Sequence, residues 1–161
     1  MTPKSLLRAK DATSPLSEFT KGEFKTVIGP ARAEVEPDKV KRVIACSGKV
    51  AYDLIKKRDE KKAWDVAILR VEQLYPFPAK ALITELSRFR NAEMVWCQEE
   101  PKNMGAWSFV DPYLEWVLAH IDAKHQRVRY TGRPASASTA TGLMSKHLAQ
   151  LNAFLEDALG N

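Results

Sequence analysis

Two short polar segments of the sequence carry the residue types that could do chemistry. Ser47-Gly48-Lys49 follows one apolar run and Gln98-Glu99-Glu100 follows another, so each would stand where a buried strand ends. At a helix start, free backbone N–H groups and the Lys49 charge could hold a phosphate or another anion. Ser47 is also a good helix N-cap, and the GxxxxGK[ST] frame of a P-loop is absent. The motif therefore favours capping over ligand binding.

The carboxylates of Glu99 and Glu100 are adjacent in the chain. They cannot face each other as an acid/base pair unless the segment folds back on itself. Ion pairing with Lys102 or with arginines of a partner is the simpler expectation. Trp96 and Trp107 bracket the segment, and core packing explains them more economically than stacking on a substrate.

The other reactive residue types form no recognisable site. Cys46 and Cys97 each end an apolar run without a CxxC spacing, which predicts two reduced, partly buried thiols. His120, His125 and His147 show neither HxxxH nor HExxH spacing, so solvated or capping roles are favoured over metal binding. A nucleophile elbow and a GxGxxG motif are also absent. The sequence thus predicts a polar edge without a self-sufficient catalytic centre.

Alternating strands and helices must position these segments. Asp65–Val71 is an apolar, β-branched run typical of a strand, and Leu82, Leu86 and Phe89 recur at helical spacing. We expect strands at 40–46, 65–71, 92–97 and 128–130, helices at 50–62, 79–89, 106–120 and 143–159, and an ordered loop at 131–142. This alternation predicts an α/β fold, a three-layer α/β/α arrangement with a mostly parallel sheet. Ligands and partner surfaces gather at the carboxyl ends of such strands.

Residues 1–39 differ from this pattern because prolines and glycines punctuate them, and only Phe24–Ile28 resembles a short strand. We expect an N-terminal arm at 1–39, packing on the domain or on neighbours outside this sequence, and an α/β domain at 40–161. In Pro3–Arg8 two basic residues flank an apolar pair, as in an arm that packs on something larger. A solvated, frayed terminus remains an equal alternative.

Composition limits the classes of function. The 161 residues suffice for one domain that buries roughly 70% of its unfolded surface. No apolar run approaches the length of a membrane span, and the start of the chain lacks the apolar region of a signal peptide, which predicts a cytoplasmic protein without membrane contact. The net charge of +5 comes from dispersed basic residues, so nucleic-acid binding is not expected.

Five segments in order resemble one known family over essentially the whole chain: TPKSLLR (2–8), RVIACSGKVAYDL (42–54), DVAILRVEQLYPFP (65–78), WCQEEPKNMGAW (96–107) and YTGRPASAS (130–138). They resemble the carboxyl-terminal, transketolase-C-like region of the E1 component of bacterial 2-oxoglutarate dehydrogenase. The resemblance implies that the full enzyme of the tricarboxylic acid cycle uses thiamin diphosphate and magnesium. It implies oxidative decarboxylation of 2-oxoglutarate and transfer of the succinyl group to a lipoyl arm of the E2 component.

In that family the cofactor and catalytic residues lie in upstream domains, and no GDG…N motif for the metal diphosphate occurs in this sequence. We therefore assign no catalytic, cofactor-binding or metal-binding residue to this chain and expect it to be inactive alone. The resemblance leaves it a structural and regulatory role. It would pack on the remaining E1 domains, support the E1 homodimer in the complex with the E2 succinyltransferase and, as in some bacterial relatives, form part of an adenine-nucleotide or acetyl-CoA effector site.

The candidates for this effector or interface surface are residues of the arm and of the carboxyl edge of the sheet: Lys4, Arg8, Ser47, Lys49, Arg70, Gln98, Glu99 and Arg133. An alternative from another class remains open. In it the chain is a stand-alone sensor that binds an adenine nucleotide or an acyl-CoA at the Ser47–Lys49 edge.

Overall fold

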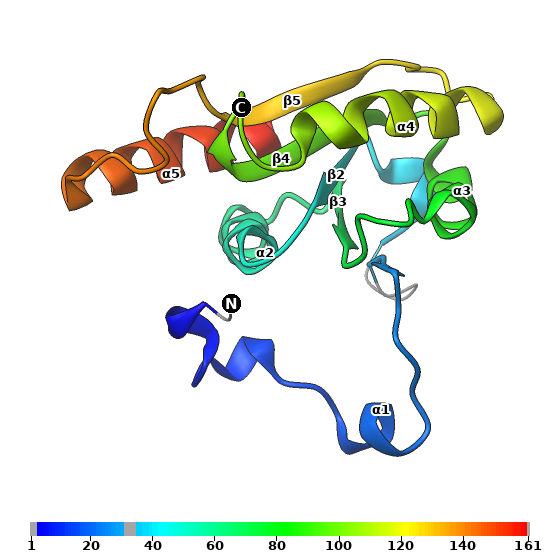
Figure 1. Ribbon diagram of the computed structural model, residues 1–161. Coiled ribbons are helices and arrows are strands. Elements are labelled where there is room, and N and C mark those ends of the chain that lie inside the picture. The colour runs from blue at the N-terminus through cyan, green and yellow to red at the C-terminus, as the bar shows by residue number, and fades with distance from the viewer. Residues whose placement is uncertain (1–2, 31–34, 161) are drawn as a thin grey trace.

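A five-stranded sheet organises the protein, as the computed structural model of residues 3–30 and 35–160 shows (Figure 1). Parts of the expected arm (1–2 and 31–34) and the last residue, 161, lie outside the described residues. The strand order is β1-β3-β2-β4-β5. The strands are β1 (Val27–Ile28), β2 (Arg42–Cys46), β3 (Val66–Val71), β4 (Glu93–Pro101) and β5 (Val128–Arg133). Strands β2 to β5 are parallel, and the short β1 pairs antiparallel with β3.

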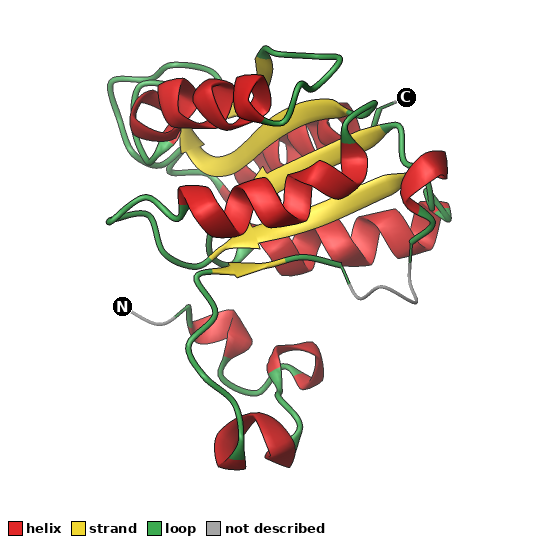
Figure 2. Ribbon diagram, turned by 90° about the vertical axis from the view of Figure 1, so that its right-hand side faces the viewer, coloured by secondary structure: helices red, strands yellow, loops and turns green. Residues whose placement is uncertain are grey.

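Helices cover both faces of the sheet (Figure 2). Helices α2 (Val50–Lys61) and α5 (Met144–Leu159) pack on one face, where Ile44, Leu54 and Phe154 share one apolar cluster. Helices α3 (Ala79–Leu86) and α4 (Trp107–His120), with the 3-10 turn η4 (Ser87–Phe89), pack on the other face around Trp96 and Leu114. The central strands are apolar on both sides because both sides are covered. The expected mostly parallel, three-layer α/β/α fold is confirmed.

Residues 3–30 form short pieces of regular structure that lie to one side of the sheet (Figure 1). They are η1 (Lys4–Leu6), η2 (Lys10–Ala12), the five-residue α1 (Leu16–Thr20) and β1, and η3 (Pro37–Lys39) precedes β2. The strand expected at 24–28 is shorter than predicted. Only Val27 and Ile28 reach the edge of β3, opposite Val71 and Arg70, while Phe24 remains 71% exposed.

Two strands run beyond the ends that the sequence predicts. β4 continues past Cys97 to Pro101, and β5 continues past Tyr130 to Arg133. The two extensions pair with each other, with Pro101 opposite Arg133 beyond an irregularity in the register. The apolar pattern stops before these extensions, so it could not indicate them. As a consequence, Gln98-Glu99-Glu100 belongs to a strand and not to a loop.

Within residues 3–30 and 35–160, no helix combines the length and apolar character needed to cross a bilayer.

Cys46 and Cys97 lie directly opposite each other on β2 and β4, and both are free, fully buried thiols. Burial raises the pKa of Cys46 to about 12 and also raises the pKa of Cys97. Because the thiolate is the reactive form, we expect neither residue to react with iodoacetamide at pH 8 in the folded protein and both to react in guanidinium chloride. Mass spectrometry of the labelled protein measures this, and rapid labelling of either thiol without denaturant would contradict it.

Candidate functional site at the carboxyl edge of the sheet

The turn from β2 into α2 contains the first candidate motif. Gly48 has φ 78°, a left-handed conformation that glycine adopts without steric cost. Helix α2 begins at Val50 with Lys49 as the residue before it, and no side chain caps its N-terminus. The expectation that Ser47 is the N-cap is therefore wrong. The turn places Ser47 two positions before the cap, too early to bond the first free N–H groups.

Lys49 joins two elements by ion pairs. Its Nζ donates to Asp53 Oδ2 at 2.7 Å, one turn along α2, and lies 2.9 Å from Glu99 Oε1 on β4. Burial favours the neutral amine, but hydrogen bonds to both carboxylates outweigh it and raise the pKa of Lys49. Glu99 thus pairs with Lys49 and not with Lys102, whose ammonium lies 5.5 Å from the ring of Tyr130. The charge of Lys49 is already balanced.

Gln98 does not project from the edge as expected, because its side chain is only 3% exposed. Its Oε1 accepts from Trp96 Nε1 and from the backbone N–H of Trp107, both at 3.0 Å. Its Nε2 donates to the carbonyl oxygens of Met104 at 2.7 Å and Pro101 at 3.2 Å. This one amide holds the loop between β4 and α4 closed, which local sequence could not reveal because its partners come from both ends of that loop.

Arg133 ends β5 and is 9% exposed. Its Nε donates to Gln150 Oε1 and its Nη2 to His147 Nδ1, both at 3.1 Å and both on α5. Its Nη1 donates to the backbone oxygen of Glu99. Arg133 therefore links β5, β4 and α5. From the sequence we expected only a solvated or capping role for His147, and its contact with this arginine was missed.

Tyr130, three residues before Arg133 on β5, supports the same corner. Its hydroxyl donates to the backbone oxygens of Arg133 at 2.8 Å and Glu100 at 3.2 Å. Burial is the main reason that the pKa of Tyr130 rises to about 12. The phenol therefore stays a neutral hydrogen-bond donor.

The structure separates the remaining candidates. Arg70 pairs with Glu72 at 2.9 Å and stacks 5.5 Å from the ring of Tyr52, on the α2 side of the sheet. Lys4 and Arg8 are exposed on the arm, and within the described residues neither makes an ion pair with the edge.

Candidate residues line three cavities. Ser47 and Gln98 line one of about 340 Å³. Arg70 lines one of about 480 Å³ together with Asp11 of the arm. Arg133 lines one of about 260 Å³ beside α5. The eight candidates thus form separate groups and not one site.

Across the described ranges, no three His, Cys, Asp or Glu side chains gather as metal ligands would. The arrangement offers cations, amides and hydroxyls.

Comparison with known proteins identifies the family. The family model described as 2-oxoglutarate dehydrogenase C-terminal matches residues 13–159. The chain is 68% identical over 171 aligned residues to the 2-oxoglutarate dehydrogenase E1 component of Brucella anthropi, covering 100% of this chain and 17% of that protein. It is 69% identical over 169 residues to the E1 component of Brucella abortus, covering 99% of this chain and 17% of that protein. The chain spans about a sixth of the length of these relatives. It belongs to the 2-oxoglutarate dehydrogenase C-terminal family.

Proposed function

We propose that this chain is the structural and regulatory C-terminal domain of a thiamin-diphosphate-dependent 2-oxoglutarate dehydrogenase E1. The observation that carries the proposal is the 68% identity, over the full chain, to proteins named as that E1 component. The complete E1 would decarboxylate 2-oxoglutarate oxidatively and pass the succinyl group to a lipoyl arm of E2. This identity favours the E1 domain over a stand-alone nucleotide or acyl-CoA sensor.

The residues of this chain do not fit a site for thiamin diphosphate and magnesium. The sequence lacks a GDG…N motif, and the described residues contain no cluster of three potential metal ligands. We therefore derive no catalytic step from this chain. The cofactor and the metal would be held by other parts of the E1 polypeptide.

Exposed aromatic residues support a packing role. Tyr113 and Trp116 on α4 are 44% and 48% exposed, and Phe19 and Phe24 of the arm are more exposed still. Tyr113 and Trp116 are three residues apart and share one face of α4, and exposed apolar side chains that cluster mark interaction sites on folded proteins. In a complete E1, these surfaces would meet the preceding domains or the second subunit of a homodimer. The division into an arm at 1–39 and a domain at 40–161 is part of the same proposal.

The proposed effector or interface surface keeps the candidates of the sequence analysis. Lys4, Arg8 and Arg70 supply cationic groups, Ser47, Lys49 and Glu99 lie at the carboxyl ends of β2 and β4, and Arg133 lies at the end of β5. An adenine nucleotide or acetyl-CoA bound at Lys49 would have to compete with the two carboxylates that already pair with it. Gln98 lines a cavity with Ser47, but its amide is already bonded to Trp96, Trp107, Pro101 and Met104.

A chimera tests the proposed function. In it, this chain replaces the matching segment of the Brucella anthropi E1 component. We expect the chimera to retain 2-oxoglutarate decarboxylation close to the parent rate and the parent's oligomeric state. The isolated chain should show neither turnover nor thiamin diphosphate binding by calorimetry. Turnover by the isolated chain, or a folded but inactive chimera, would overturn the proposal.

A further inference from the structure

Arg133 is a buried cation without a carboxylate partner among the residues that the structure describes. Its three partners are neutral: a backbone oxygen of Glu99, the amide of Gln150 and the ring nitrogen of His147. A guanidinium has five N–H groups, so two remain for another acceptor. Burying a charge without a counter-charge is unfavourable. The site therefore has both the donors and the electrostatic need for an anion.

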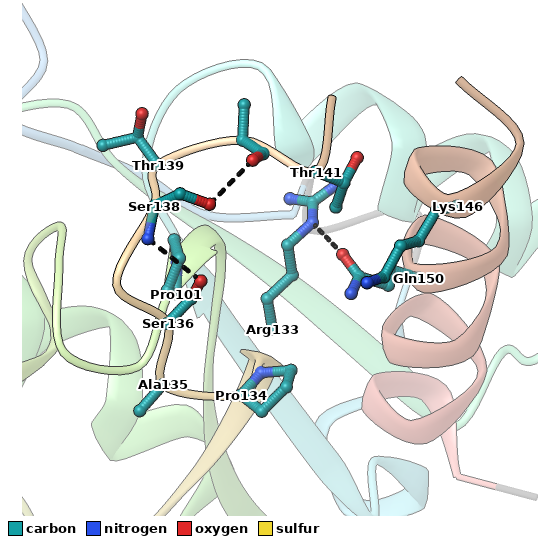
Figure 3. A pocket seen from close by; sticks show the side chains of 11 residues that line it. Pro101, Arg133, Pro134, Ala135, Ser136, Ser138, Thr139, Thr141, Lys146 and Gln150 are labelled. Atoms are coloured by element: carbon teal, nitrogen blue, oxygen red, sulfur yellow. Dashed lines mark hydrogen bonds between the residues drawn. The ribbon is translucent and has the colours of Figure 1, made fainter. Parts of the chain in front are cut away.

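A cavity of about 260 Å³ lies against this arginine, between the end of β5, the loop after it and the first two turns of α5 (Figure 3). Lys146 lines the same cavity and makes no ion pair within the described part of the chain. Hydroxyl groups of Ser136 and Thr139 are also in its wall. Among the described residues, none of those that line it carries a carboxylate. All of its charged groups are therefore positive.

The loop beside the cavity is held by hydrogen bonds within the loop and by hydrogen bonds to Asn103, which follows β4. The side chain of Asn103 donates to the backbone oxygen of Ser136 and accepts from its N–H, each at 3.0 Å. The hydroxyl of Ser138 donates to the carbonyl of Ala140 at 2.9 Å, and Thr141 donates to the carbonyl of Leu143 at 3.2 Å. These hydrogen bonds define the conformation of the cavity wall.

Lys146 stands in the first turn of α5, and the dipole of that helix adds to the positive potential beside the cavity. This 16-residue helix begins at Met144, has no side-chain cap and carries no acidic residue in its first turn. Its first N–H groups have no partner within the helix, and the helix dipole is positive at this end. Phosphate groups bind readily at such helix starts.

We propose that this cavity binds a phosphoryl group of a small ligand, held by Arg133 and Lys146. The planar fork of an arginine matches phosphate oxygens, and the lysine supplies a point charge. The volume is below the range of about 300–1,000 Å³ that is usual for drug-sized ligands, which fits a small phosphorylated group. The site differs from the Lys49 turn, where the cation is already paired with carboxylates. Every group that it uses is within this chain, so it does not depend on the proposed E1 function.

Amide NMR of the chain titrated with inorganic phosphate, at constant ionic strength set with chloride, tests the proposal. We expect saturable shifts confined to residues 131–150. Lys146→Ala should weaken the apparent affinity by about tenfold, because a hydrogen bond to a charged group is lost. Arg133→Lys should weaken it as well, since the charge is kept but the fork is not. Lys124→Ala, which removes the same charge from an exposed residue of the distant segment between α4 and β5, is the control and should bind as the parent does.

Three results would overturn the proposal. The first is the absence of saturation in the parent chain. The second is an equal loss of affinity in Lys124→Ala and Lys146→Ala, which would show a general charge effect. The third is equally tight binding of acetate, which would make the cavity a carboxylate site, as for an acidic side chain of a neighbouring polypeptide. None of these results bears on the chimera experiment, so the two proposals fail separately.

Discussion

Replacing Gln98 by glutamate should lower the free energy of unfolding by about 4 kcal/mol at pH 7. The carboxylate keeps the two acceptor contacts to Trp96 Nε1 and the Trp107 N–H. It loses the donor that serves the carbonyl oxygens of Pro101 and Met104 and sets a buried negative charge against them. The deficit should shrink as the pH falls, because a protonated glutamic acid is neutral and can donate one hydrogen bond. Urea denaturation at several pH values measures both effects.

Gln73→Glu is the matched control for this prediction. Gln73 makes the same kind of bond, from Nε2 to the carbonyl of Pro76 at 2.8 Å, but it lies at the surface. We expect a loss below about 1 kcal/mol there, because water can replace the bond and solvate the charge. Similar losses at the two positions would show that burial of the Gln98 amide is not what makes it important.

Gly132→Ala should lower the free energy of unfolding by about 3 kcal/mol, near the upper end for inserting a methyl group into packed structure. A Cβ at this position would lie 2.7 Å from the backbone oxygen of Gln98 and 2.5 Å from the hydroxyl of Tyr130. The first contact is with the backbone of β4, next to the irregularity in its pairing with β5, and cannot be relieved by a side-chain rotation. Thermal or chemical denaturation measures the loss.

Gly142→Ala separates steric contact from backbone conformation. Gly142 has φ 74°, but a Cβ there would meet nothing within 4 Å. We expect a loss of only about 1 kcal/mol, the cost of placing alanine in a left-handed conformation. If Gly142→Ala were as destabilising as Gly132→Ala, the close approach of β4 to β5 would not be the reason for glycine at position 132.

Gln98 and Gly132 bear on the proposed phosphoryl site, because both stabilise the corner where β4, β5 and α5 meet. Tyr130 bonds the backbone oxygen of Arg133, and Arg133 bonds the backbone oxygen of Glu99. A shift of β5 against β4 would therefore move the guanidinium that the ligand needs. The stability of this corner and the affinity of the cavity should change together.

The sequence by itself determined the fold class and the approximate extent of the main elements. Apolar runs such as Asp65–Val71 and helical spacing such as Leu82, Leu86 and Phe89 depend on which side of an element faces the core, and that information is local. The ordered segments of family resemblance were likewise readable from the chain. The family that they indicated was confirmed by the match to residues 13–159, which holds four of the five segments, and by the E1 relative aligned over the whole chain.

Only the tertiary structure decided the roles of the polar residues. The buried amide of Gln98 anchors a loop, and Lys49 forms an ion pair with Glu99 on another strand. Arg133 contacts His147 and lines a cavity beside α5. Ser47 was misjudged because capping depends on where the helix begins, and the turn placed that start at Val50. The physical reason is common to all of them. The role of a polar side chain depends on which groups lie within bonding distance of it. Here those groups belong to segments that come together only when the sheet and its helices pack.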